Sequence, residues 1–106
     1  MSGVMSKVAF ASKISVLMKT TSDDPTPTPG YLYGEVTKIS FESVEYCEHM
    51  VEFLMSRLKK KSLNVKLKTL LVLRNVLDKG SGEFNRSLRK QSADIKEMKT
   101  FSGISM

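Results

Sequence analysis

Apolar residues recur along most of the chain at spacings of three and four, the period of one face of an α-helix. The first such stretch covers residues 4–18 and stops at Thr21-Ser22-Asp23-Asp24. Residues 24–30 contain three prolines, which cannot continue a helix, so we expect a Pro-rich loop between the first and second helices. The expected buried stripe of the first helix consists of Val4, Val8, Ala11, Ile14 and Met18.

Two further helices are indicated between the Pro-rich loop and residue 58. Thr28-Pro29 is typical of a helix cap followed by a proline in the first turn. The stripe of this second helix would consist of Leu32, Val36 and Ile39. Ser43 is a favourable cap for the third helix. The apolar side of the third helix holds Cys47, Met50, Val51, Leu54 and Leu58.

The stretch from Leu63 to Lys79 differs because its apolar residues occupy nearly all sides of a helical wheel. Such a helix is usually buried among other helices, and we expect the same here. Gly80 follows directly and predicts a left-handed C-cap, a conformation that glycine adopts without strain. The one polar strip of the helix is formed by Lys61, Lys68, Asn75 and Lys79.

Two shorter helices follow. Ser81 can cap a fifth helix with Phe84 and Leu88 facing inward. Ser92 opens a sixth, with Ile95 and Met98 facing inward and Phe101 beyond them. The pattern therefore predicts an all-α fold of about six short helices, and paired helices of this length suit an α-superhelix. At 106 residues the chain has room for one small domain, residues 1–106.

Charge is unevenly distributed. Residues 1–56 hold four basic and seven acidic side chains, whereas residues 57–106 hold thirteen basic and four acidic ones. This asymmetry indicates either an anionic partner or a solvated basic surface. The single cysteine excludes an internal disulfide and fits a reducing compartment.

The sequence offers few candidates for catalysis. Cys47 and His49 are the only residues of their types, and they point about 200° apart on a helix, so they cannot act together. We expect a packed thiol and a surface histidine. Gly80-Ser81-Gly82 lacks the lysine and preceding strand of a phosphate-binding loop. Asp23-Asp24 is more typical of a loop or cap than of a metal site. We therefore expect no catalytic residues, no metal and no cofactor.

The most concentrated candidate site is basic and lies around the turn between the third and fourth helices. Such a cluster is suited to an inositol phosphate headgroup, an anionic membrane or an acidic partner protein. Nucleic acid is disfavoured because aromatic residues are not interleaved with the basic ones. A solvated helix end that complements its own dipole is the remaining alternative. The cluster consists of Arg57, Lys59, Lys60, Lys61, Lys66 and Lys68.

Several blocks over residues 10–103 resemble the ENTH/VHS superfamily and, within it, the tepsin-type ENTH domains. The blocks include Thr21-Ser22-Asp23-Asp24, Pro29-Gly30-Tyr31-Leu32, residues 53–58, residues 65–70 and Gly80-Ser81-Gly82-Glu83-Phe84. Blocks at residues 88–95 and 101–103 extend the resemblance. The family-motif positions are Thr21, Ser22, Asp23, Pro29, Gly30, Tyr31, Gly80, Ser81 and Phe84.

The resemblance implies a right-handed superhelix in an adaptor of clathrin-type or related vesicle traffic. It implies a non-catalytic protein-interaction module, cytoplasmic and peripheral at the trans-Golgi network or coated vesicles. Its implied partners are vesicle-coat proteins, with the fourth adaptor complex among them, and no nucleic acid. The alternative within the superfamily is a module that binds phosphoinositides or anionic membranes.

Two departures from the resemblance bear on these alternatives. Met18 and Asp23 stand where epsin-type relatives carry a basic residue and an asparagine, whereas Arg57 and Lys68 of the lipid pocket are retained. An acid would repel a phosphate there, so we expect no strong lipid binding. The chain also ends before the final helices of the family. We therefore expect a truncated domain that either is marginally stable or self-associates through a surface left uncovered, formed by Leu88, Ile95, Met98 and Phe101.

Overall fold

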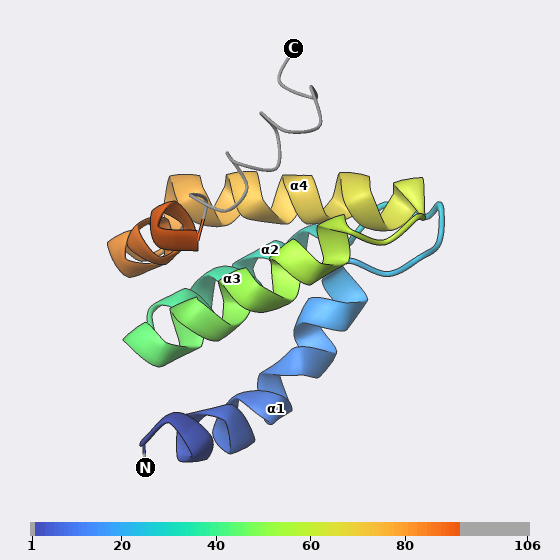
Figure 1. The fold of residues 1–106 in the computed structure, drawn as a ribbon. Helices are drawn as coiled ribbons and strands as arrows, with labels where there is room; N and C mark the ends of the chain where they lie inside the picture. Colours follow the sequence, from blue (N-terminus) through green and yellow to red (C-terminus); the bar gives the residue numbers. More distant parts are fainter. Residues whose placement is uncertain (1, 92–106) are drawn as a thin grey trace, which may run out of the picture.

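The computed structural model describes residues 2–91, and the side chains from residue 8 onward. Four helices follow one another along the chain, α1 (Ser2–Thr20), α2 (Gly30–Ser40), α3 (Val44–Leu58) and α4 (Leu63–Lys79). Residues 82–91 are also helical. This described part is entirely helical, which confirms the all-α fold class; the expected sixth helix lies outside it. Figure 1 shows α2, α3 and α4 stacked side by side, with α1 against α2 and α3.

The core lies between these helices and contains side chains from all of them. Leu17 of α1, Val36 of α2, Leu54 of α3 and Val72 of α4 are fully buried. Phe84 anchors the helical segment 82–91 to the same cluster. The expected stripes of the second and third helices are confirmed, since every one of their members except the half-buried Leu58 is buried.

Serine side chains begin three of the helical segments. Ser43 Oγ accepts a hydrogen bond from the Tyr46 N–H at 3.0 Å, and Ser62 Oγ accepts one from the Val65 N–H at 3.3 Å. Ser81 Oγ accepts from the Glu83 N–H at 3.1 Å. Each bond satisfies an N–H that has no partner within its helix. At α2 the expected arrangement is shifted, because Pro29 itself occupies the cap position and the helix begins at Gly30.

The buried face of α1 differs from the expected stripe. Phe10, Leu17 and Thr20 are buried, whereas Val8 is 68% exposed and Met18 is also exposed. Both sets have helical spacing and both lie next to Ile14, so periodicity alone fits either face. The larger apolar side chains of Phe10 and Leu17 remove more area from water, which favours the observed face.

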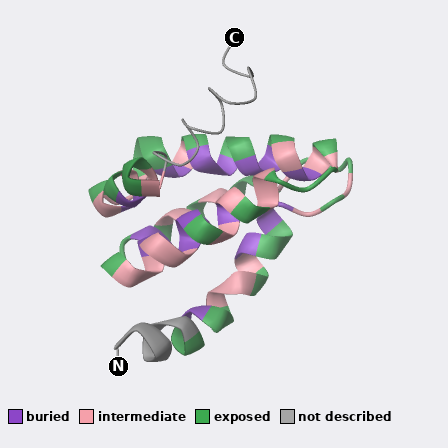
Figure 2. Cartoon of the chain, viewed as in Figure 1, coloured by how far each residue is buried: buried purple, intermediate pink, exposed green. Residues whose placement is uncertain are grey.

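The expectation that α4 is buried on nearly all sides is wrong. Its buried residues form one face, and this face includes Lys68 from the expected polar strip. Figure 2 shows the outer side of α4 coloured as exposed. Five leucines lie there, which we call the α4 leucine stripe: Leu63, Leu67, Leu70, Leu71 and Leu77, with exposed fractions of 39–73%.

Gly80 ends α4, but not in the expected left-handed conformation. Its backbone is extended, with φ −89° and ψ −170°, which any residue can adopt. Glycine is required there for space. A Cβ at this position would lie 2.6 Å from the Val76 carbonyl oxygen and 2.8 Å from Ser40 Oγ.

Candidate binding surface around the Pro-rich loop and α4

Arg57, near the C-terminal end of α3, binds the chain just after α1. Its Nε donates to Thr21 Oγ1 at 3.1 Å and its Nη2 donates to the Thr21 carbonyl oxygen at 2.7 Å. The guanidinium also lies 5.8 Å from the centroid of the Phe53 ring, within the range of a cation–π contact. Two of the five N–H donors of Arg57 are therefore directed into the domain.

Lys68 of α4 forms the second connection to the same segment. Its ammonium donates to Ser22 Oγ at 3.2 Å and lies 3.4 Å from Asp24 Oδ1. The Ser22 hydroxyl in turn donates to Asp24 Oδ2 at 2.8 Å. Lys68 is only 7% exposed and lies beneath the Pro-rich loop. The carboxylate of Asp24, the first residue of that loop, balances the charge of the buried ammonium. A pocket of about 240 Å³ lies here, lined by Lys19, Ser22, Asp24, Thr26, Pro27, Thr28, Pro29 and Lys68.

Asp23 connects the same loop to the start of α4. Its carboxylate accepts hydrogen bonds from the hydroxyl of Ser62, the N-cap residue of α4, and from Asn64 Nδ2. A carboxylate beside a helix N-terminus is stabilised by the helix dipole. The four residues from Thr21 to Asp24 thus hold α1, α3 and α4 together.

The charge of Asp24 depends on these bonds. The Ser22 hydroxyl, the Thr26 N–H and the Lys68 ammonium together lower the pKa of this carboxyl below its usual value of 3.8, against the opposing effect of partial burial. Because the folded-state pKa is lowered, the stabilisation is present above the unfolded-state pKa and is lost as the pH falls through the folded-state value.

We therefore expect Asp24→Asn to lower the free energy of unfolding at pH 7, and to lower it by less at a second, acidic pH below the unfolded-state pKa of 3.8, where part of the wild-type stabilisation has been lost. Urea unfolding of both proteins at the two pH values checks this. An equal difference between wild type and variant at both pH values would contradict the role assigned to the carboxylate.

The predicted basic cluster is divided by the fold. Arg57 and Lys68 are directed into the domain, whereas Lys59, Lys60 and Lys61 are exposed in the turn between α3 and α4 and Lys66 is half-buried. The two cations that the sequence analysis assigned to a lipid pocket are therefore engaged by Thr21, Ser22 and Asp24.

The family model for the ENTH domain matches residues 12–106, which is most of the chain. The chain belongs to the ENTH domain family. It is 45% identical over 100 residues to the AP-4 complex accessory subunit tepsin of Xenopus laevis, and the match covers 94% of this chain. Over 97 residues, it is 42% identical to the tepsin of Mus musculus and 40% identical to that of Homo sapiens.

These comparisons confirm the resemblance to tepsin-type ENTH domains. The two mammalian matches cover 92% of this chain. The matched regions make up 18%, 17% and 18% of the three relatives. This chain thus spans less than a fifth of their length.

The other family-motif positions of this ENTH domain fall into two groups, one packed within the domain and one exposed. Ser81 and Phe84 begin and anchor the helical segment 82–91, and Gly80 allows the close approach of α2. Pro29, Gly30 and Tyr31, by contrast, are exposed at the start of α2.

Cys47 and His49 are both packed into the ENTH domain. Cys47 is fully buried, its Sγ donates to the Ser40 carbonyl oxygen at 3.1 Å, and burial raises the pKa of the thiol to about 11. A packed thiol was expected. His49 was expected at the surface, but its side chain is only 12% exposed and its ring lies 5.3 Å from that of Phe10. Residue 10 was not assigned to the core in the sequence, so this packing was missed.

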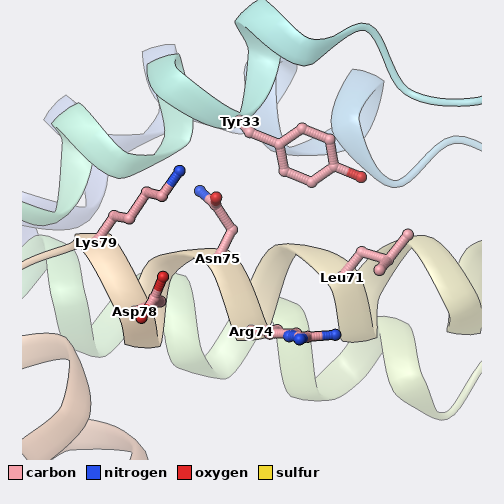
Figure 3. Close-up of a pocket in the computed structure, with 6 residues that line it drawn as sticks. All are labelled: Tyr33, Leu71, Arg74, Asn75, Asp78 and Lys79. Carbon is pink, nitrogen blue, oxygen red and sulfur yellow. The ribbon is translucent and has the colours of Figure 1, made fainter.

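The sequence analysis also missed the exposed face of α4. A pocket of about 410 Å³ lies between α2 and α4. Figure 3 shows Tyr33 of α2 above Leu71, Arg74 and Asn75 of α4. A second pocket of about 610 Å³ lies between α4 and residues 82–91, where Leu70, Leu77 and Leu88 contribute to the lining. The spacing of the leucines on one side of α4 was the available signal.

Within residues 2–91, no helix combines the length and the hydropathy needed to cross a bilayer.

Proposed function

We propose that this ENTH domain is a non-catalytic protein-interaction module of a tepsin-like adaptor in vesicle-mediated transport from the trans-Golgi network. Similarity to proteins named as accessory subunits of the AP-4 complex supports this role. The observation that carries it is the internal engagement of Arg57 and Lys68. A phosphate ligand would have to compete with Asp24 for Lys68 and with Thr21 for Arg57, which disfavours a lipid headgroup.

Affinity capture from cells with the tagged 106-residue chain as bait, followed by mass spectrometry, tests this function. The proposal predicts enrichment of AP-4 subunits and other vesicle-coat proteins over a capture with an unrelated helical domain of equal charge. A capture in which these proteins are no more abundant than in the control contradicts it. The charge-matched control is needed because a basic domain retains acidic proteins non-specifically.

Binding to phosphoinositides or anionic membranes is the second candidate, and the exposed Lys59, Lys60 and Lys61 favour it. Each basic residue near an anionic lipid surface contributes about 1 kcal/mol. This candidate predicts salt-sensitive binding to anionic vesicles that is lost when the three lysines are reversed in charge.

A further inference from the structure

Two Thr-Pro pairs, Thr26-Pro27 and Thr28-Pro29, lie in the Pro-rich loop. A threonine followed by proline is the acceptor motif of proline-directed serine/threonine kinases. Proline suits the position after the acceptor because it has no N–H, so it leaves no unpaired donor in a kinase cleft that lacks an acceptor there. The two pairs are equivalent as sequence motifs, and only their surroundings in the fold distinguish them.

The fold holds the two threonines differently. Thr28 is half-buried, and its Oγ1 donates a hydrogen bond to the Thr20 carbonyl oxygen at the end of α1, at 2.8 Å. Thr26 is exposed between two exposed prolines, and its N–H donates to Asp24 Oδ1 at 2.9 Å. Among the described residues, the Thr26 hydroxyl makes no hydrogen bond. A kinase can therefore take up this hydroxyl without breaking a bond that it makes, whereas phosphate on Thr28 would replace the contact that ties the loop to α1.

Thr26 lies on a surface loop at one end of the domain. Residues 24–29 are neither helix nor strand, and residues 25–27 are all exposed. Figure 1 shows the loop beside the beginning of α4, at the end of the molecule opposite the helical segment 82–91. A kinase can therefore reach the acceptor without unfolding a helix, as is usual for modified and cleaved segments of folded proteins.

An unpaired cation lies in the pocket that Thr26 helps to line. This pocket of about 240 Å³ beside the loop includes Lys19 at the end of α1 and Lys68 of α4. Lys68 is buried and paired with Asp24. Lys19 is exposed and forms no ion pair with another described residue, so its ammonium is available to a new anion. A phosphothreonine carries a charge of about −1.5 to −2 at pH 7, which an adjacent ammonium stabilises.

We propose that Thr26 accepts a phosphate from a proline-directed serine/threonine kinase and that this phosphate pairs with Lys19. The Thr26 hydroxyl oxygen forms a bond to the γ-phosphorus of ATP, and the hydroxyl proton passes to the carboxylate base of the kinase. The bond from that phosphorus to the bridging oxygen breaks, and its electron pair leaves with ADP. The phosphate makes the net charge of the pocket negative, so the pocket then repels other anions. This regulation goes beyond the proposed function and does not depend on it.

Incubation of the folded 106-residue chain with ATP and a mitogen-activated protein kinase tests the acceptor. Trypsin releases residues 20–38, which contain both threonines, and fragmentation in a mass spectrometer locates the phosphate. The ratio of phosphate on Thr26 to phosphate on Thr28 should be at least about fivefold higher in the chain than in a synthetic peptide of residues 20–38, because only the folded chain has the hydrogen bond of Thr28. Thr26→Ala should remove most of the phosphate. No phosphate on Thr26, an equal ratio in chain and peptide, or unchanged incorporation in Thr26→Ala would overturn the proposal.

Titration of the phosphorylated chain followed by ³¹P NMR tests the pairing. A neighbouring ammonium lowers the second pKa of a phosphothreonine, which is ordinarily about 6. Lys19→Gln should raise this pKa by at least about 0.2, the size of a surface ion pair. The matched control Lys38→Gln, exposed on α2 and outside the pocket, should leave it unchanged. The same phosphate pKa in wild type and Lys19→Gln would overturn the assignment of Lys19.

Discussion

Replacing Gly80 with alanine is expected to lower the free energy of unfolding by about 2–3 kcal/mol, because the added methyl has no room. The Cβ would lie 2.6 Å from the Val76 carbonyl oxygen and 2.8 Å from Ser40 Oγ. These atoms are already engaged, since the Gly80 N–H donates to the Val76 carbonyl at 2.7 Å and the Ser81 N–H donates to Ser40 Oγ at 3.0 Å. Relief of the contact must therefore disturb both the end of α4 and its packing on α2.

Urea unfolding of the variant measures this effect, and Gly82→Ala is the matched control two residues away. A Cβ at Gly82 meets nothing within 4 Å, and the residue is helical. Alanine should therefore raise the stability at this position by about 0.5–1 kcal/mol. Similar changes in the two variants would show that the spacing around Gly80 is not the reason for glycine there.

Phe84→Ala is expected to have the largest effect of any single truncation, a loss of about 3–5 kcal/mol. Phe84 is fully buried and has the largest fully buried side chain among the described residues. It connects the helical segment 82–91 to the core formed by α1 to α4. Since small domains have a total stability of about 5–15 kcal/mol, the variant should be partly unfolded at 37 °C.

Thermal unfolding followed by circular dichroism checks this expectation. Phe41→Ala provides the control, because Phe41 is 64% exposed and its truncation should change stability by no more than about 0.5 kcal/mol. Phe84→Leu keeps most of the buried volume and remains measurable if the alanine variant does not fold. Equal melting temperatures for the Phe84→Ala and Phe41→Ala proteins would contradict the packing of residue 84.

Local signals in the sequence accounted for the helices. Helical periodicity and the cap residues Ser43 and Ser81 predict where segments lie because both act over a few residues. The side of a helix that is buried is a different matter. In α1 two stripes have the same period, and in α4 valines on one side and leucines on the other are both apolar, so the choice of buried side depends on which neighbouring helices are present.

The connections in the candidate site were beyond prediction from spacing. Arg57 and Thr21 are 36 residues apart, and Lys68 and Asp24 are 44 apart. Sequence analysis recognised Arg57 and Lys68 as basic and Asp23 as unfavourable for a phosphate. It had no means of finding that Asp24, one residue further, neutralises Lys68. Gly80 illustrates the same limit. Its identity correctly indicated the end of α4, but glycine is needed there because of the close approach of Ser40 from α2, which the sequence does not reveal.

Flotation of the 106-residue chain with liposomes tests most directly whether this ENTH domain binds phosphoinositide membranes, which is the alternative to protein recognition. Vesicles with 5% phosphatidylinositol bisphosphate are compared with neutral vesicles at low salt, using the wild type and a variant with Lys59, Lys60 and Lys61 each replaced by glutamate. The internal engagement of Arg57 and Lys68 predicts that wild type and variant both stay with the unbound protein on both vesicles. Flotation of the wild type on the phosphoinositide vesicles alone, reversed by salt and abolished in the variant, would contradict this account.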